Sequence, residues 1–138
     1  MKRLAFMLVA GGSLAFGGAV LARQGQPASA AQVAAAVQKQ FPVAASISKS
    51  PDEAVFRARC QYCHVEMGMG TLTIAKRLGP DKALLADRKD LTGDYIRAVV
   101  RHGFSTMPAI SRAEVSDPEL DAIVRFLTRN NPAETRKK

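Results

Sequence analysis

The segment Cys60-Gln61-Tyr62-Cys63-His64 constrains this chain more than any other part of its 138 residues. It contains both cysteines of the chain, three residues apart, and a histidine directly follows the second one. Two cysteines cannot build a disulfide-rich scaffold or a four-cysteine zinc site. The apolar patterning around the segment delimits a domain of about 80 residues, a size at which the core is thin and usually needs a covalent or metal staple.

The spacing of these residues is that of covalent c-type haem attachment. Two thiols three residues apart on a helical turn can reach the two vinyl groups at one edge of a porphyrin, and the next imidazole is held beneath the iron. We therefore predict one covalent haem c, joined by thioether bonds to Cys60 and Cys63, with His64 as the proximal iron ligand.

The same residues have three alternative uses. C-x-x-C pairs also serve thiol–disulfide exchange, but that fold needs a strand–helix–strand context, and the sequence has no convincing period-2 strand. A structural disulfide suits an oxidising compartment but would leave the domain without a large apolar core element. Zinc would need more ligands at the usual spacing than Cys60, Cys63, His64 and His102 provide.

The N-terminus has the pattern of an export signal. A basic start, Met1-Lys2-Arg3, precedes a run from Leu4 to Ala22 in which Ser13 is the only polar side chain. The small or modest residues Val20-Leu21-Ala22 end the run, which predicts a signal peptide over residues 1–22, cleaved after Ala22, and a periplasmic protein. The alternative is an uncleaved anchor, because the run nearly spans a bilayer. Its four glycines disfavour a lasting helix, so we expect no stable membrane anchor.

Residues 23–49 form an Ala-rich segment of low charge. We expect a flexible linker, because an Ala-rich segment this short is marginal as a helix unless it packs on something. The alternative is one short helix with a thin apolar face, since Val33, Val37 and Phe41 recur every four residues and Pro42 would end the helix.

The domain from residue 50 to residue 131 has the periodicity of an all-α fold with three main helices. Ser50 is placed to cap the first helix, and Gly103 follows the second one as a stop. The three helices are expected from Ser50 to about His64, from Thr92 to about Arg101, and from Ser116 to Asn130.

Two remaining segments are expected to be less regular. Leu72 to Leu85 is apolar but interrupted by Gly79-Pro80, which predicts a loop with one or two short helical turns. Residues 132–138 form a basic C-terminal tail.

The second axial ligand of the iron must come from far along the chain. Met67 and Met69 follow His64 too closely, because a few residues at about 3.3–3.6 Å each cannot comfortably pass round the porphyrin rim. Met107 lies 43 residues after His64, in a loop flanked by a glycine and a proline. We therefore predict Met107 as the distal ligand. His102 is the alternative and would give bis-His iron, although a histidine at a helix end more often caps carbonyls or faces solvent.

From about residue 51 to residue 131 the chain resembles the class I cytochromes c in their short bacterial form. The resemblance rests on Phe56 four residues before the first cysteine, on the haem motif, on Tyr95-Ile96 through Gly103 to Met107-Pro108, and on the apolar helix Leu120 to Leu127. It implies a helical bundle that encloses one haem, with the first and last helices crossing beside it.

Two positions depart from the pattern of that family. The small residue that the family often places at the helix crossing, eight residues before the first cysteine, is Asp52 here. The glycine–proline–leucine segment after the haem motif is replaced by Gly70-Thr71-Leu72 or by Leu78-Gly79-Pro80. Either would supply the backbone carbonyl that orients His64.

The predicted coordination sphere points to electron transfer. Ligation by His64 and Met107 would leave the iron no open position for substrate, and Met/His ligation raises the reduction potential relative to bis-His iron. We predict a periplasmic one-electron carrier cycling between Fe(III) and Fe(II), an electron-transfer protein rather than an enzyme. By analogy with similar small cytochromes, it could be the electron-acceptor subunit of an exported dehydrogenase. The alternative class is a haem enzyme or ligand sensor with a labile sixth ligand, peroxidase-like or gas-binding.

The formal net charge of +8 falls by two once the leader is removed. A positive carrier can be steered to acidic redox partners, here a dehydrogenase donor and an oxidase or another cytochrome as acceptor. No nucleic-acid partner is expected, because no nucleic-acid-binding motif is present. The cations that could dock a partner are Lys76, Arg77, Lys82, Arg88 and Lys89, although the aspartates between them favour a mixed, solvated surface. Arg88, Arg101 and Tyr95 remain open as donors to the haem propionates.

Overall fold

The structure is a computed structural model that describes residues 28–136. The predicted signal peptide, residues 1–22, lies outside the described residues. Within them the chain forms helices and no strand, so the all-α prediction is confirmed. The α-helices are α1 (Ala30–Gln40), α2 (Pro42–Ser46), α3 (Pro51–His64), α4 (Met69–Leu78), α5 (Gly93–His102), α6 (Asp117–Thr128) and α7 (Pro132–Thr135). Two 3-10 turns, η2 (Pro80–Lys82) and η3 (Leu85–Asp87), lie between α4 and α5.

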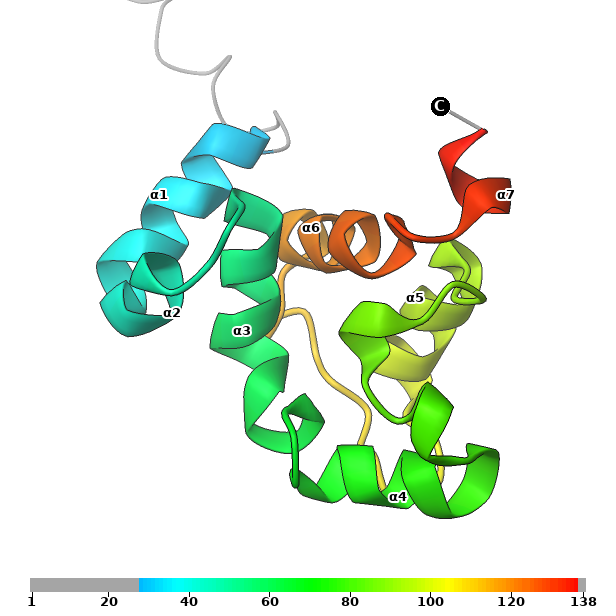
Figure 1. Cartoon of the computed structure of the whole chain (residues 1–138). Coiled ribbons are helices and arrows are strands. Elements are labelled where there is room, and N and C mark those ends of the chain that lie inside the picture. Colours follow the sequence, from blue (N-terminus) through cyan, green and yellow to red (C-terminus); the bar gives the residue numbers. More distant parts are fainter. Residues whose placement is uncertain (1–27, 137–138) are drawn as a thin grey trace, which may run out of the picture.

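Helices α3, α4, α5 and α6 frame the domain. In Figure 1, α3 and α5 lie on opposite sides, α6 lies above them and α4 below, and the segment between α5 and α6 runs between α3 and α5. No helix within residues 28–136 is long and apolar enough to cross a membrane.

Helix α3 forms where its start signal predicts. The Ser50 hydroxyl accepts a hydrogen bond from the Glu53 main-chain N–H at 3.1 Å, and Pro51 occupies the first turn, where no N–H is needed. The helix ends at His64, as predicted. It therefore carries the whole Cys60–His64 segment in regular helical geometry.

The core of the domain lies where α3 meets α6. Val55 and Ile123 are almost completely buried there, and the rings of Phe56 and Phe126 pack with their centroids 5.2 Å apart. A capping box begins α6, in which the Glu119 carboxylate accepts from the Ser116 N–H at 2.8 Å. Because apolar burial is the main stabilising term in a domain this small, this contact fixes α3 relative to the rest of the fold.

The Ala-rich segment differs from the expected linker. It forms α1 and α2, which pack against α3, so the short-helix alternative describes residues 30–40. A capping box between Ser29 and Gln32 begins α1, and Val33 and Val37 are buried in the same core as α3 and α6. The packing supplies the stabilisation that an isolated Ala-rich helix lacks.

The segment after the haem motif is also more regular than expected. A ten-residue helix, α4, occupies residues 69–78, where the sequence favours a loop with short turns beginning at Leu72. Gly79 ends α4 with a φ of +97°, and Pro80 then begins η2. The predicted short turns are thus confined to residues 80–87. In the predicted basic tail, residues 132–135 form the short helix α7.

Candidate haem site

Cys60, Cys63 and His64 lie on the last turn and a half of α3. Positions separated by three and four residues share one face of an α-helix, so the three side chains project from the same side. Cys60 is half-buried and packs against the core, whereas Cys63 is exposed, and neither forms a disulfide. The helix therefore presents two free thiols and an imidazole together, with the first thiol at the edge of the core.

The His64 ring is held against the start of α4. Burial lowers its pKa, which favours the neutral imidazole that binds iron. Its Nδ1 atom is buried and has no hydrogen-bond partner within the described residues. A Cβ at Gly70 would lie 2.7 Å from His64 Cε1 and 2.8 Å from the Cys63 carbonyl oxygen, so only glycine fits there. The missing Cβ of Gly70 leaves room for the imidazole.

The expected carbonyl contact to His64 is not formed. Of the two segments considered, the one containing Gly70 lies against the imidazole, while a Cβ at Gly79 would instead contact the Asp81 side chain. No carbonyl of either segment accepts a hydrogen bond from His64 Nδ1. The helical course of α4 explains the difference, because it directs the carbonyls of residues 69–74 into its own hydrogen bonds.

The environment of Cys60 argues against thiol–disulfide exchange. Burial raises the pKa of its thiol to about 12, although the nearby Arg59 charge acts in the opposite direction. Exchange requires an accessible thiolate, which a lowered pKa favours. No group of three or more His, Cys, Asp or Glu side chains that could hold a metal ion occurs in residues 28–136, which disfavours the zinc alternative for this part of the chain.

Met107 closes a tight turn between α5 and α6. We call residues 104–107 the Met107 turn. The main-chain groups of Phe104 and Met107 bond to each other in both directions, at 2.9 and 3.0 Å, and Ser105 between them has a φ of +57°. The Met107 side chain is half-buried and packs against the core. The turn therefore fixes the main chain that carries the thioether.

Gly103 fixes where the Met107 turn begins. It ends α5 with a φ of +75°, in the region that favours glycine, and a Cβ there would lie 2.7 Å from the Met107 carbonyl oxygen. The main chain that follows the Met107 turn is also hydrogen-bonded to α5. Arg101 Nη1 donates to the carbonyl oxygens of Ile110 and Ser111, and the Ile110 N–H donates to the Val100 carbonyl at 2.8 Å.

A cleft of about 800 Å³ reaches His64 from the side of α3 that faces η3 and the end of α6. Its volume lies in the range of cofactor pockets. Its lining includes apolar residues, Phe56, Leu84, Ala86 and Phe126, and the cations Lys49, Arg57 and Arg129. Cys60, Cys63 and Met107 lie outside this lining, so the cleft brings only the imidazole of the predicted ligand set to its wall.

Comparison with protein families decides the identity of the domain. The profile of the family described as cytochrome c oxidase, cbb3-type, subunit III matches residues 50–127. The chain belongs to this family of c-type cytochromes. No curated protein and no solved structure matches the chain at a significant level.

The other candidate iron ligands lie at the surface of the cytochrome domain. Met67, in the turn before α4, and Met69, the first residue of α4, are 79% and 74% exposed. His102 is exposed in the last turn of α5. Among the alternatives, Met107 is thus the half-buried one, and its role as distal ligand stays a prediction.

Both arginines considered for propionate binding have protein partners in the cytochrome. Arg88 donates two hydrogen bonds to Asp90, at 2.8 and 2.9 Å, and Arg101 donates one to Asp117. Tyr95 is half exposed on α5. Arg101 keeps one buried donor, Nε, without a partner within residues 28–136.

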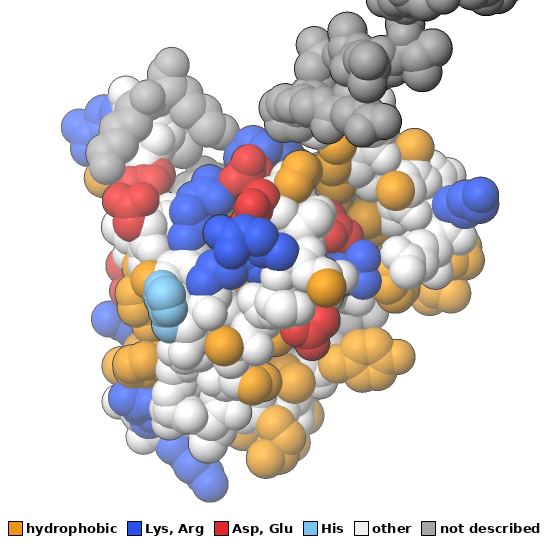
Figure 2. All heavy atoms as spheres, turned by 180° about the vertical axis from the view of Figure 1, so that it is seen from behind, with side chains coloured by type: hydrophobic (Ala, Val, Ile, Leu, Met, Phe, Trp, Pro, Cys, Tyr) orange, Lys and Arg blue, Asp and Glu red, His pale blue; other side chains and the backbone are white. Residues whose placement is uncertain are grey.

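The surface charge of the cytochrome is mixed, as its sequence favours. Figure 2 shows Lys and Arg side chains interleaved with Asp and Glu on the face seen from behind. Much of this interleaving is direct pairing, as in the ion pairs Arg97–Asp121, Arg101–Asp117, Arg112–Asp117 and Arg125–Asp52. Of the cations considered for docking, Lys82 and Arg88 both lie beside Asp90.

Two site residues carry a role that the sequence alone does not reveal. Gly70 makes room for the His64 ring, and Arg77 of α4 stacks on Phe104 of the Met107 turn, with its guanidinium carbon 4.8 Å from the ring centroid. The glycine could have been found from its position six residues after the haem histidine, where a helix would otherwise prefer another residue. The Arg77–Phe104 contact has no local signal.

Proposed function

We propose that this cytochrome is a periplasmic one-electron carrier whose haem is held by Cys60, Cys63 and His64, with Met107 as the distal ligand. The family supports a haem-based electron carrier. The observation that carries the residue assignment is the common face of α3 on which both free thiols and the neutral imidazole lie. Once bound, the haem supplies one-electron chemistry at its iron.

In the proposed site, the protein's own residues would hold the haem in a fixed position. Helix α3 fixes both cysteines and His64 through its packing on α6, and Gly70 leaves space for the imidazole. The main-chain bonds of the Met107 turn hold the thioether at the core edge. Rigid ligands change little when charge is gained, which is the condition for fast electron transfer.

We further propose that the carrier exchanges electrons with exported redox proteins. The matching family is described as a subunit of a cytochrome c oxidase, so an oxidase is one acceptor that fits. An exported dehydrogenase is the donor that the sequence resemblance favours. The formal charge of +8 stays positive after the leader and its two cations are removed, which suits partners with acidic surfaces.

The proposal is tested on the full chain produced in a periplasm that attaches haem. Haem-peroxidase staining should remain on the chain in a denaturing gel, and acid–acetone should extract no colour. The oxidised protein should show the red charge-transfer band of iron–sulfur ligation. Met107→Ala should abolish this band and admit carbon monoxide to the reduced iron, while the control Met69→Leu should change neither property.

Two results would overturn the proposal. A band that survives Met107→Ala would place the sulfur ligand elsewhere. A wild-type protein without the band that binds carbon monoxide readily would favour the haem enzyme or ligand sensor. Co-purification with a dehydrogenase or an oxidase from native periplasm would identify the partner.

A further inference from the structure

Helix α4 contacts both segments that carry the predicted axial ligands. Its first turn lies against His64, where Gly70 leaves the space for the imidazole. Near its other end, Arg77 lies over the ring of Phe104, which belongs to the Met107 turn. Gly70 and Arg77 are about 10 Å apart along the helix at 1.5 Å per residue. One rigid helix therefore connects the predicted proximal ligand with the turn that carries the predicted distal ligand.

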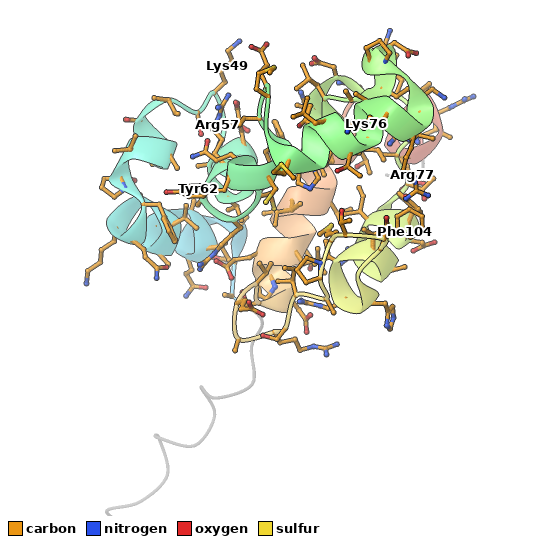
Figure 3. All side chains as sticks on the ribbon, turned by 90° about the horizontal axis from the view of Figure 1, so that it is seen from below. Lys49, Arg57, Tyr62, Lys76, Arg77 and Phe104 are labelled. Atoms are coloured by element: carbon orange, nitrogen blue, oxygen red, sulfur yellow. The ribbon has the colours of Figure 1, made fainter. Side chains whose placement is uncertain are left out.

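The Arg77–Phe104 contact occurs at the surface. Phe104 is 51% exposed, and Arg77 is exposed and has no ion pair within residues 28–136. Figure 3 shows Arg77 and Phe104 close together at one end of α4, with Lys76 on the same helix. A guanidinium within about 6 Å of an aromatic centroid is attracted to the ring face. The contact is thus an attraction between two segments that are far apart in the sequence.

A displacement of Phe104 would be transmitted to Met107. The two residues share both main-chain hydrogen bonds of the turn, so they move as a unit. Ser105 between them adopts a φ of +57°, which a residue with a side chain holds only where its surroundings fix it. The ring of Phe104 is the part of this turn that α4 holds in place.

We propose that Arg77 is a positioning residue for Met107, acting through Phe104 to hold the Met107 turn against α4 and so to keep the thioether on the iron. The inference rests on the proposed function, because it requires Met107 to be the distal ligand. Arg77 itself touches neither the haem nor its iron in this role.

The experiment measures how readily imidazole replaces the sulfur ligand in the oxidised, haem-loaded full chain. Arg77→Ala weakens the hold on the turn, so imidazole should bind roughly two- to fivefold more tightly, as expected for losing an exposed cation–π contact. The red sulfur band should persist without imidazole. Phe104→Leu should have the same effect, and the double variant should add little to either single one. Arg77→Lys should restore part of the wild-type behaviour.

Lys76→Ala is the matched control. Lys76 neighbours Arg77 and carries the same charge, but it has no aromatic or ionic contact in the described part of the chain, so its loss should leave imidazole binding unchanged. Equal effects of Arg77→Ala and Lys76→Ala, or additive effects of Arg77→Ala and Phe104→Leu, would overturn the proposal. Failure of the proposed function would give a different result. Imidazole would then bind the wild-type protein and the Met107→Ala variant with the same affinity.

Discussion

Asp52 of α3 and Arg125 of α6 are joined by two hydrogen bonds, of 3.0 and 2.7 Å, where the first and last helices of the cytochrome domain cross. Class I cytochromes c, which this chain resembles, often have a small residue at the position of Asp52. Here the carboxylate stays at the rim, where it is 29% exposed, and its partner lies on the other helix. The crossing is therefore compatible with a charged residue, because the charge is paired and partly solvated.

Asp52→Asn should lower the free energy of unfolding by about 1 kcal/mol, because a partly exposed ion pair with two hydrogen bonds lies at the upper end of surface pairs. Denaturant unfolding of the haem-loaded protein measures this. The pair Arg112–Asp117 is the comparison, since both side chains are mostly exposed, and Arg112→Ala should have almost no effect. Equal losses in the two variants would show that the crossing pair has no special role.

Val37→Ala should destabilise the protein by roughly 2 kcal/mol, because it leaves a cavity where α1 packs on the shared core. Val43→Ala on α2 removes the same atoms from a side chain that is 71% exposed and should be nearly neutral. Thermal or denaturant unfolding of both variants distinguishes a packed α1 from a flexible linker. If Val37→Ala were as mild as Val43→Ala, α1 would contribute nothing to the domain.

Glu119 should make the protein sensitive to acid. Burial alone would raise the pKa of its carboxyl, but hydrogen bonds from Arg59 and Ser116 outweigh burial and hold it below the usual 4.5. A lowered folded-state pKa contributes stability that is present above the unfolded-state pKa and is lost as the pH falls through the folded-state value. Glu119→Gln should therefore be less stable than wild type at neutral pH, and the difference should shrink below about pH 4.5. Urea unfolding of both proteins over this pH range measures the difference in stability. A difference that does not change with pH would contradict the lowered pKa of Glu119.

Gly70→Ala should disturb the His64 side of the site. The added Cβ would lie 2.7 Å from the imidazole and 2.8 Å from a main-chain oxygen, so either α4 or the histidine must move. We expect less haem-loaded protein and a lower free energy of unfolding, read from the haem-to-protein absorbance ratio and from denaturant unfolding. Gly93→Ala is a milder comparison, because its Cβ would meet a Val124 methyl group at 3.2 Å. A haem content equal to that of Gly93→Ala would mean that the imidazole has room to shift.

The parts of the fold that the sequence predicts are those with local signals. Helices α3, α5 and α6 begin at capping residues. Helix α3 ends at His64, α5 ends before Gly103, and α6 ends at Thr128, so their bounds agree with expectation to within two residues. Helix α1 could not be predicted from local signals alone, because its stability depends on the packing of Val33 and Val37 in a core made by residues far along the chain. The sequence does not predict helix α4, because Gly79-Pro80 interrupts the apolar run that begins at Leu72 and two further glycines flank and interrupt the first turn of the helix.

The candidate site also has one part that local sequence signals predict and another that depends on packing. The cysteine–histidine segment is contiguous, and its proposed chemistry follows from its spacing alone. The relation of Gly70 to His64 and that of Arg77 to Phe104 depend on the direction in which α4 leaves the turn at residues 65–68. That direction is a property of packing. Gly70 is therefore indicated only by its position after the haem histidine, and no local pattern indicates the Arg77–Phe104 contact.

Under the proposed ligation of the iron by Met107, Gly103→Ala should displace Met107 and weaken that bond. Two effects act together, since the residue has a φ of +75° and an added Cβ would lie 2.7 Å from the Met107 carbonyl oxygen. Gly79→Ala is the matched control: its φ is +97°, but the added Cβ would meet only the side chain of Asp81. Both variants should lose about 1 kcal/mol or more of stability from backbone strain. Only Gly103→Ala should also reduce the red sulfur band and increase imidazole binding. If both variants kept the band, the main chain of the Met107 turn could accommodate the methyl group without moving the thioether.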